Sequence, residues 1–355
     1  MNEAFTASAP GRVCLFGEHQ DYLGWPAVVM AIDLRCRIRF SRRDDRRVHW
    51  SSPALELQGQ YDLDRLPVSA LEHGQRNDHM MAALIEAGRA GWTWPCGWNA
   101  VIESEIPVQA GCSSSTALIS AWILGLAKMA GHALSPSDLV EASHRAEVLH
   151  FDEPGGQMDH QAIAYGGLNR VHADGDIYTL PLEGLGDFLL GDSGVPKNTL
   201  AVLTRCKTDR LELLSRMGGH WDGELPGGVS AIQDADLLKS TLLNKQIEEE
   251  ASAALSGDMC SASDRSALGK MMDVHHSMLA EHLGVSTVKI DAMCRAGRIA
   301  GALGAKINGS GGGGCMLAWL HPEDRDTKRA TVLSLEQAGA ARVVQVRPDS
   351  GAKID

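Results

Sequence analysis

The chain contains 355 residues, of which 44% are hydrophobic and 22% are charged, a balance typical of folded rather than disordered proteins. Because this length exceeds that of a single core, we expect two closely packed domains. The formal net charge of −12, with no basic block to offset it, argues against nucleic acids and anionic membranes as partners.

The first residues and the cysteines indicate the compartment. Residues 1–13 lack the charged start and the apolar stretch of a signal peptide, and no apolar run reaches the roughly 18 residues of a membrane span. The eight cysteines include no CxxC pair, which is typical of free thiols in a reducing compartment. We therefore expect a cytoplasmic protein.

Two strands are expected near the N-terminus. Short apolar and β-branched runs occupy residues 12–16 and 27–40, and Gly17 and Pro26 bound the turn between them. This turn contains the cluster Gly-Glu-His-Gln-Asp-Tyr. A polar turn can be merely solvated or can form a binding site, and the local sequence leaves both alternatives open.

A helix, a strand and two further helices are expected next. Residues 71–90 have helical periodicity, and residues 97–108 alternate like a strand. A segment that is apolar on nearly every face then predicts a buried helix ending at Gly131. Ser135, followed by proline, is the expected N-cap of the next helix. Near the end of that helix the dipole disfavours the carboxylate of Glu147, so we expect a cation or donor beside it unless it is solvated.

The middle of the chain predicts a change of domain. Residues 151–171 indicate a glycine-rich turn, a short helix and a strand. Residues 176–183 and 199–205 are strand-like, and they flank the loop Gly-Asp-Ser-Gly-Val-Pro-Lys-Asn at 191–198.

The second half of the chain has a mixed pattern. A helical segment at 236–255 alternates with strands at 315–320 and 341–348, which favours an α+β fold. We expect an N-terminal domain over residues 1–185 and a C-terminal domain over residues 186–355.

The segment "PVQAGCSSSTAL", residues 107–118, is a candidate phosphate site. Gly111 would let the backbone approach a phosphate closely, and the three serines Ser113, Ser114 and Ser115 stand where free backbone N–H groups of the following helix attract anions. A serine-rich helix cap is the simpler alternative. The Walker pattern GxxxxGK[ST] is absent from the sequence.

The segment "KINGSGGGGC", residues 306–315, contains a GxGxxG pattern from Gly309 to Gly314. A strand rather than a helix follows it, which makes a dinucleotide-binding fingerprint a poor interpretation. So dense a glycine run suggests a tight turn or a close approach of backbone to a ligand, with a flexible loop as the alternative.

Two carboxylates lie close together in the sequence. Asp159 follows a glycine-rich approach, and Glu147 precedes it by twelve residues. Phosphoryl transfer needs a metal that neutralises phosphate charge and a carboxylate beside the attacking hydroxyl. The nearby histidines His144, His150 and His160 lack the spacing of a zinc site, so zinc is not expected.

In this order the segments resemble the GHMP kinases, the family of galactokinase, homoserine kinase, mevalonate kinase and phosphomevalonate kinase. The segment "APGRVCLFGEHQDYLG" resembles the first family motif in its galactokinase form, residues 107–118 the second, and residues 306–315 the third. The stretches at 145–160 and 271–291 are also similar to galactokinases. The resemblance runs from about residue 7 to residue 320.

The resemblance implies a fold and a set of catalytic residues. The fold would be α+β with two domains, the first like ribosomal protein S5 domain 2 and the second ferredoxin-like. Arg12 and Asp159 would be the catalytic pair, with Asp159 oriented toward the attacking hydroxyl. Ser115 and Glu147 would hold Mg²⁺ on the phosphates of ATP. The implied nucleotide-binding residues are Gly111, Cys112, Ser113, Ser114, Ser115, Gly309, Ser310 and Gly311.

The resemblance also gives a role to the turn after the first strand. Glu18, His19 and Asp21 would bind sugar hydroxyls, which explains acids where an anionic substrate would need bases. Asp192, in the loop at 191–198, is a further candidate substrate contact, with an ordinary hinge loop as the alternative.

Several residues depart from the galactokinase pattern. Gln109 replaces a glycine and Thr116 a smaller residue in the second motif, so the path of the phosphate loop is open. Asn308 and Ser310 replace other small residues in the third, and the segment after the first motif resembles mevalonate kinases as much as galactokinases.

The expected function is therefore phosphorylation of a monosaccharide hydroxyl by ATP and Mg²⁺, most simply the anomeric hydroxyl of galactose or a related hexose. The alternatives are a mevalonate-type kinase and a non-catalytic sugar-sensing protein on the same fold. The expected partners are ATP and the sugar, and the expected state is a monomer or homodimer.

Overall fold

The computed structural model describes residues 4–67, 78–153, 155–197, 199–216, 232–257, 261–322 and 324–355. The predicted helix at 71–90 falls partly outside these ranges, and its described part begins at His79. Among the described residues, no helix is both long and apolar enough to cross a membrane.

The first half of the chain is built on a sheet that has eight strands in its described part. The strand order is β12-β1-β2-β5-β3-β4, and β6 pairs with both β2 and β7. All these pairs are antiparallel except β3 with β5. The strands are β1 (Phe5–Phe16), β2 (Ala27–Arg42), β3 (Arg47–Ser52), β4 (Leu57–Asp62), β5 (Trp98–Ser104), β6 (Leu168–Val171), β7 (Ile177–Thr179) and β12 (Lys353–Ile354).

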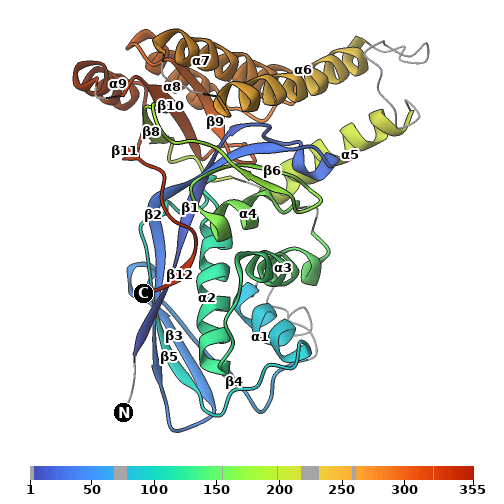
Figure 1. Cartoon of the computed structure of the whole chain (residues 1–355), viewed down its shortest axis with the longest axis vertical. Helices are drawn as coiled ribbons and strands as arrows, with labels where there is room; N and C mark the ends of the chain where they lie inside the picture. The colour runs from blue at the N-terminus through green and yellow to red at the C-terminus, as the bar shows by residue number, and fades with distance from the viewer. Residues whose placement is uncertain are drawn as a thin grey trace.

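Helices cover one face of this sheet, with α2 (Ser114–Ala130) lying along it in Figure 1. The face is covered because α2 is apolar nearly all round, and its Trp122 packs at a tilt against Phe40 of β2 and Trp98 of β5 in the core. The predicted end of this helix at Gly131 is confirmed. The other helical elements are η1 (Asp21–Leu23), η2 (Pro53–Leu55), α1 (His79–Arg89), α3 (Pro136–Glu147), η4 (Leu149–Phe151) and α4 (Met158–Tyr165).

The second half of the chain has an antiparallel sheet of four described strands, ordered β11-β8-β10-β9. Helices α7, α8 and α9 pack against it, and Figure 1 shows them above the first sheet. The elements are β8 (Asp187–Asp192), α5 (Thr199–Arg216), α6 (Ile232–Leu255), α7 (Ala262–Ser277), the π-turn η5 (Met278–His282), α8 (Val288–Ile299), β9 (Gly304–Asn308), β10 (Cys315–Leu320), α9 (Arg325–Gln337) and β11 (Arg342–Val346).

The strand predicted at 199–205 is wrong, because these residues begin helix α5. Cys206, Arg210 and Leu213 are its buried side chains, spaced four and three residues apart as on one face of a helix. The helical pattern of the longer window therefore outweighs the apolar run that suggested a strand. The strand of this region is β8, which ends at Asp192 and so includes the first two residues of the loop predicted at 191–198.

The end of the chain returns to the first sheet. After β11, Asp349 forms an ion pair with the buried Arg35 of β2, in which Arg35 Nη1 lies 2.8 Å from Asp349 Oδ2. The last strand, β12, then pairs with β1. The mixed α+β architecture agrees with the expected fold class. The division into domains between residues 185 and 186 stays a prediction. Strand β12 lies after this division but belongs to the first sheet.

Candidate active site

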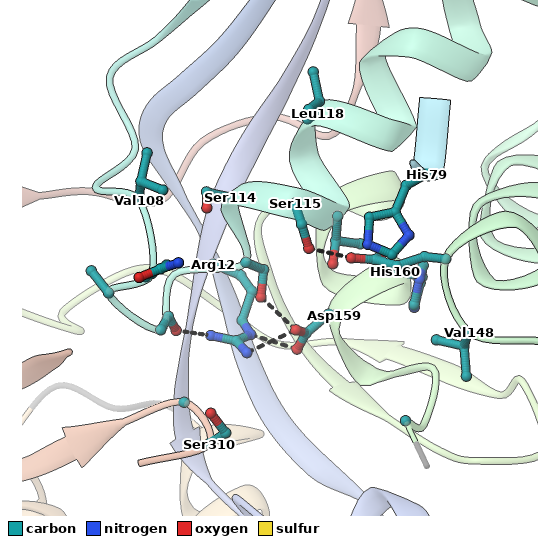
Figure 2. A pocket seen from close by; sticks show the side chains of 18 of the residues that line it. Arg12, His79, Val108, Ser114, Ser115, Leu118, Val148, Asp159, His160 and Ser310 are labelled. Carbon is teal, nitrogen blue, oxygen red and sulfur yellow. Dashed lines mark hydrogen bonds and ion pairs between the residues drawn. The ribbon is translucent and has the colours of Figure 1, made fainter. Parts of the chain in front are cut away.

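A cavity of about 920 Å³ lies where the first sheet, the N-terminus of α2, helix α4 and the glycine-rich turn meet. Figure 2 shows its centre, with Asp159 facing Arg12 and with Ser114 and Ser115 on the helix beside them. The segments that line it come from both halves of the chain, since Ser310 lies on the wall opposite α2. The three segments that the sequence singled out therefore converge on one site.

The buried Arg12 and the partly buried Asp159 form a two-point ion pair. The Nε and Nη2 atoms of Arg12 donate to the two carboxylate oxygens of Asp159 at 2.7 and 2.9 Å, and Ser113 Oγ donates to the same carboxylate at 2.5 Å. Burial would raise the pKa of Asp159, but the charge and hydrogen bonds of Arg12 outweigh it and hold the pKa below its ordinary value. Asp159 is therefore kept ionised at the cavity wall.

The loop before α2 brings its backbone close to the glycine-rich turn. Gly111 has a φ of +91°, and a Cβ there would lie 2.4 Å from the carbonyl oxygen of Asn308. The carbonyl of Gly111 accepts hydrogen bonds from Arg12 Nη1 and from Asn308 Nδ2. Ser113 is in the left-handed region with a φ of +56° and makes no side-chain cap, so the helix N-terminus stays open toward the cavity.

Ser115 and Glu147 meet at the first turn of α2. Ser115 Oγ donates to Glu147 Oε1, and His160 Nε2 lies 3.0 Å from Glu147 Oε2. Burial raises the pKa of Glu147, but His160 and the Ser115 hydroxyl together hold it below its ordinary value. The sequence predicts a donor beside this carboxylate unless it is solvated. The carboxylate is buried and Ser115 is the donor, so the prediction is confirmed.

Two acidic side chains of the turn after β1, Glu18 and Asp21, have different surroundings. Glu18 pairs with Lys306 of β9 and accepts the backbone N–H of Gly309, so both its oxygens bond within the protein. Asp21 forms no ion pair among the described residues and accepts backbone N–H groups of its own turn, while burial and the charge of Asp159 raise its pKa to about 6.

His19 of the same turn is a neutral, buried imidazole. Its Nε2 contacts the carbonyl oxygen of Ser310 at 3.0 Å, and its Nδ1 contacts the hydroxyl of Tyr22 at 3.1 Å. Burial and the nearby charge of Arg210 lower its pKa to about 3. The ring is therefore uncharged, and both of its nitrogens already contact groups within the protein.

Three sequence candidates lie outside the cavity wall. Asp192 accepts the backbone N–H of Gly194 at 2.8 Å and closes the turn after β8. Cys112 is fully buried behind the loop, and Gly311 packs its backbone against Val285. These residues shape the loops whose neighbours line the cavity.

Lys197 is a cavity residue that the sequence interpretation missed. It lies in the same loop as Asp192, and its Nζ donates to Ser310 Oγ at 3.2 Å. Burial and the charge of Arg12 lower its pKa. No carboxylate among the described residues pairs with it, so it adds a positive charge to the wall. Lys197 lies in the loop motif at 191–198, where the sequence interpretation favours Asp192 as the substrate contact.

One end of the cavity is apolar. Leu118 of α2 and Val108 line this end, and Figure 2 shows both away from the ion pair. Trp50, Leu55 and Leu57 of the β3–β4 hairpin complete it. Three of these side chains are more than half exposed, namely Leu55, Leu57 and Val108. This end suits a flat apolar group, and the charged end suits an anion.

Comparisons with known proteins agree with this geometry. Residues 78–167 match the GHMP kinases N terminal domain, residues 252–339 match the GHMP kinases C terminal domain, and residues 1–42 match the galactokinase galactose-binding signature. The chain is 30% identical to a mevalonate kinase from Thermococcus onnurineus over 98% of each protein. It is 28% identical to a galactokinase from Mycobacterium bovis over 89% of each protein.

A solved structure supports the fold independently. The galactokinase of Lactococcus lactis complexed with galactose superposes with a TM-score of 0.84, covering 99% of this chain and 95% of that one at 21% identity. At that identity the likeness shows the fold alone.

Proposed function

The chain belongs to the GHMP kinase family, and we propose that within this family it transfers the γ-phosphoryl group of ATP to a hydroxyl of a neutral monosaccharide, the anomeric hydroxyl of galactose or a related hexose. The observation that carries the proposal is the ionised Asp159, paired with Arg12 at the mouth of the open α2 N-terminus. A carboxylate that accepts a hydroxyl proton and an N-terminus that attracts phosphate are thereby placed side by side.

Asp159 would orient the attacking hydroxyl and accept its proton. Arg12 keeps this carboxylate ionised, and its positive charge offsets negative charge that develops on the transferring phosphoryl group. The Ser113 hydroxyl fixes one carboxylate oxygen, so the other faces fewer protein donors. This arrangement restricts the direction from which an acceptor hydroxyl approaches.

Asp21 and His19 would bind the other hydroxyls of the sugar. Asp21 lines the cavity without an ion-pair partner among the described residues, and vicinal hydroxyls can donate to a carboxylate. Glu18 lines the same wall but is satisfied by Lys306 and Gly309, so we assign it to hold the turn as well as to face the sugar.

Ser115 and Glu147 fit the Mg²⁺ that family members use with ATP. Their hydroxyl and carboxylate are hard oxygen ligands, and within the described part of the chain Glu147 Oε2 has no hydrogen-bond partner of good geometry. Among the described residues no three His, Cys, Asp or Glu side chains are arranged to hold a metal, so phosphates and water would complete the shell. The bound ion would neutralise phosphate charge.

The rest of the cavity would accommodate the nucleotide. The backbone between Gly111 and Ser114 would wrap the phosphates, and Lys197 and Ser310 would face them from the other half of the chain. The apolar end at Trp50 and Leu118 would hold the base.

A mevalonate-type kinase is the second candidate. Mevalonate kinases are among the relatives that match almost the whole chain, which supports it, and Lys197 supplies a partly buried cation that a carboxylate substrate could use. Against it, Asp21 places an acid where such a substrate would need a base. A non-catalytic sensor is disfavoured because Arg12 and Asp159 are both present and paired.

The experiment is a panel of monosaccharides and mevalonate, each assayed with ATP and Mg²⁺ for ADP release, with wild type and Asp159→Asn compared. We expect turnover with one hexose and a loss of about 10²- to 10⁴-fold in the variant. Turnover with mevalonate alone would select the second candidate. Acceptor-dependent ADP release that survives in Asp159→Asn would overturn the mechanism.

A further inference from the structure

Histidines that the proposed function leaves unused gather around Glu147. His160 follows Asp159 directly on α4, and its Nε2 lies 3.0 Å from Glu147 Oε2. His144 of α3 packs its ring edge-on against His160, with centroids 5.2 Å apart and planes at 83°. Figure 2 shows His79 of α1 close to His160, on the same side of Ser115. Three helices thus place imidazoles behind one carboxylate.

The burial of this cluster makes its polar contacts consequential. His160 is 2% exposed and Glu147 is 8% exposed, so neither side chain can rely on bulk water. The edge-on packing of His144 limits rotation of the His160 ring. The imidazole therefore presents a fixed nitrogen to the Glu147 carboxylate.

The two oxygens of Glu147 have different neighbours. Among the described residues, Oε1 accepts a hydrogen bond from the hydroxyl of Ser115, on the cavity side, whereas Oε2 lies 3.0 Å from His160 Nε2, a contact that is not a hydrogen bond of good geometry. Ser115 is also the proposed partner of Glu147 in holding the cation. A contact on Oε2 keeps the carboxylate plane fixed without occupying the oxygen that faces Ser115.

We propose that His160 is a positioning residue that fixes the Glu147 carboxylate for the cation of the nucleotide complex. This inference rests on the proposed function, in which Glu147 is a cation ligand. Partners behind a metal ligand orient it, and their loss weakens metal affinity by about 10- to 100-fold. Because Asp159 and His160 are consecutive, α4 would hold the catalytic carboxylate and the cation ligand in register.

The test measures binding of Mn²⁺ in the presence of ADP by electron paramagnetic resonance, with the full-length chain. The variants are His160→Ala, the conservative His160→Gln, Glu147→Gln and a control, His132→Ala. His132 is exposed and follows the far end of α2, so its loss leaves the cavity intact. Binding of ADP without metal, measured by calorimetry, reports whether each variant keeps its nucleotide site.

We expect His160→Ala to weaken Mn²⁺ binding about 10- to 100-fold while metal-free ADP binding changes little. His160→Gln should recover much of the affinity, because its amide N–H can reach Oε2, and His132→Ala should match wild type. If Glu147→Gln loses Mn²⁺ and His160→Ala does not, the inference is wrong although the proposed cation site stands. If Glu147→Gln also binds Mn²⁺ like wild type, the cation site itself is wrong.

If His160→Ala proves unstable, the comparison moves to His160→Gln and a volume-matched His160→Leu. Leucine fills the space without a donor, so Mn²⁺ affinity should fall with Leu and hold with Gln. Equal affinities in these two folded variants would overturn the proposal.

Discussion

The carboxylate of Glu18 and the ammonium of Lys306 form an ion pair whose side chains are 2% and 0% exposed. Glu18 follows β1 of the first sheet, and Lys306 lies on β9 of the second. Lys306 also donates to the carbonyl oxygen of Cys14 at 2.9 Å, and Glu18 accepts the N–H of Gly309. One buried charge pair thus ties the proposed acceptor turn to the glycine-rich turn.

Replacing Lys306 with methionine should destabilise the fold strongly. The substitution leaves Glu18 as an uncompensated buried charge, which costs about 3–5 kcal/mol in comparable pairs. Denaturation by urea, followed by circular dichroism, measures the loss in free energy of unfolding. The double variant Glu18→Gln with Lys306→Met should recover part of it, because no unpaired charge remains. A single variant as stable as wild type would show that water reaches Glu18.

Asp21→Asn should increase stability at neutral pH and weaken acceptor binding. The pKa of Asp21 is about 6 in the fold, against 3.8 for a free side chain, so the folded state binds the proton more tightly. Wild type therefore loses stability as pH rises from about 4 to 6 and stays lower above that range. The variant lacks this loss. Its free energy of unfolding should therefore exceed that of wild type by near zero at pH 4 and by about 2–3 kcal/mol at pH 8.

The same variant checks the proposed role of Asp21. Loss of a charged hydrogen-bond acceptor should raise the KM of the acceptor about 10-fold or more and leave that of ATP nearly unchanged. The measurements are urea denaturation at pH 4 and pH 8 and steady-state kinetics at pH 8. A stability difference that is the same at both pH values would contradict the raised pKa.

Local features of the fold could be predicted from short patterns. Ser135 and Asp138 form the capping box of α3, and Gly131 ends α2 in the left-handed conformation. These features depend on interactions between residues three or four apart, which the sequence displays directly. For the same reason the glycine and serines before α2 are recognisable in the sequence, and their role as a phosphate site stays a prediction.

Long-range pairs could not be predicted in this way. Glu18 and Lys306 are 288 positions apart, and nothing near either residue indicates the other. The resemblance implies that Glu18 binds sugar hydroxyls, which stays a prediction, but it does not indicate that both carboxylate oxygens bond within the protein. Lys197 was missed for a similar reason, since its role depends on its position opposite Gly111.

Gly111→Ala should disrupt the phosphate loop. An alanine at a φ of +91° is strained by about 1–2 kcal/mol, and its Cβ would lie 2.4 Å from the carbonyl oxygen of Asn308 and 2.8 Å from Lys197 Nζ. The two loops must then separate, so we expect a raised KM for ATP and a lower melting temperature. Gly88→Ala is the matched control, because a Cβ there meets no atom within 4 Å and α1 should gain about 0.5–1 kcal/mol. Equal effects of the two substitutions would show that the contact between the loops is unimportant.

Lys197→Met should separate the two candidate substrates. The partly buried ammonium has no carboxylate partner among the described residues, so methionine should leave stability unchanged or increase it. If Lys197 faces the phosphates, removing one preorganised positive donor should lower kcat about 10²- to 10³-fold while the KM of a neutral sugar stays nearly constant. If it instead holds a substrate carboxylate, the KM of mevalonate should rise with a smaller change in kcat.

Lys197→Arg keeps the charge and should restore part of the activity in either case. Unchanged kinetics for every acceptor in Lys197→Met would remove this residue from the site, because a cation in contact with ligand charge must affect binding or turnover.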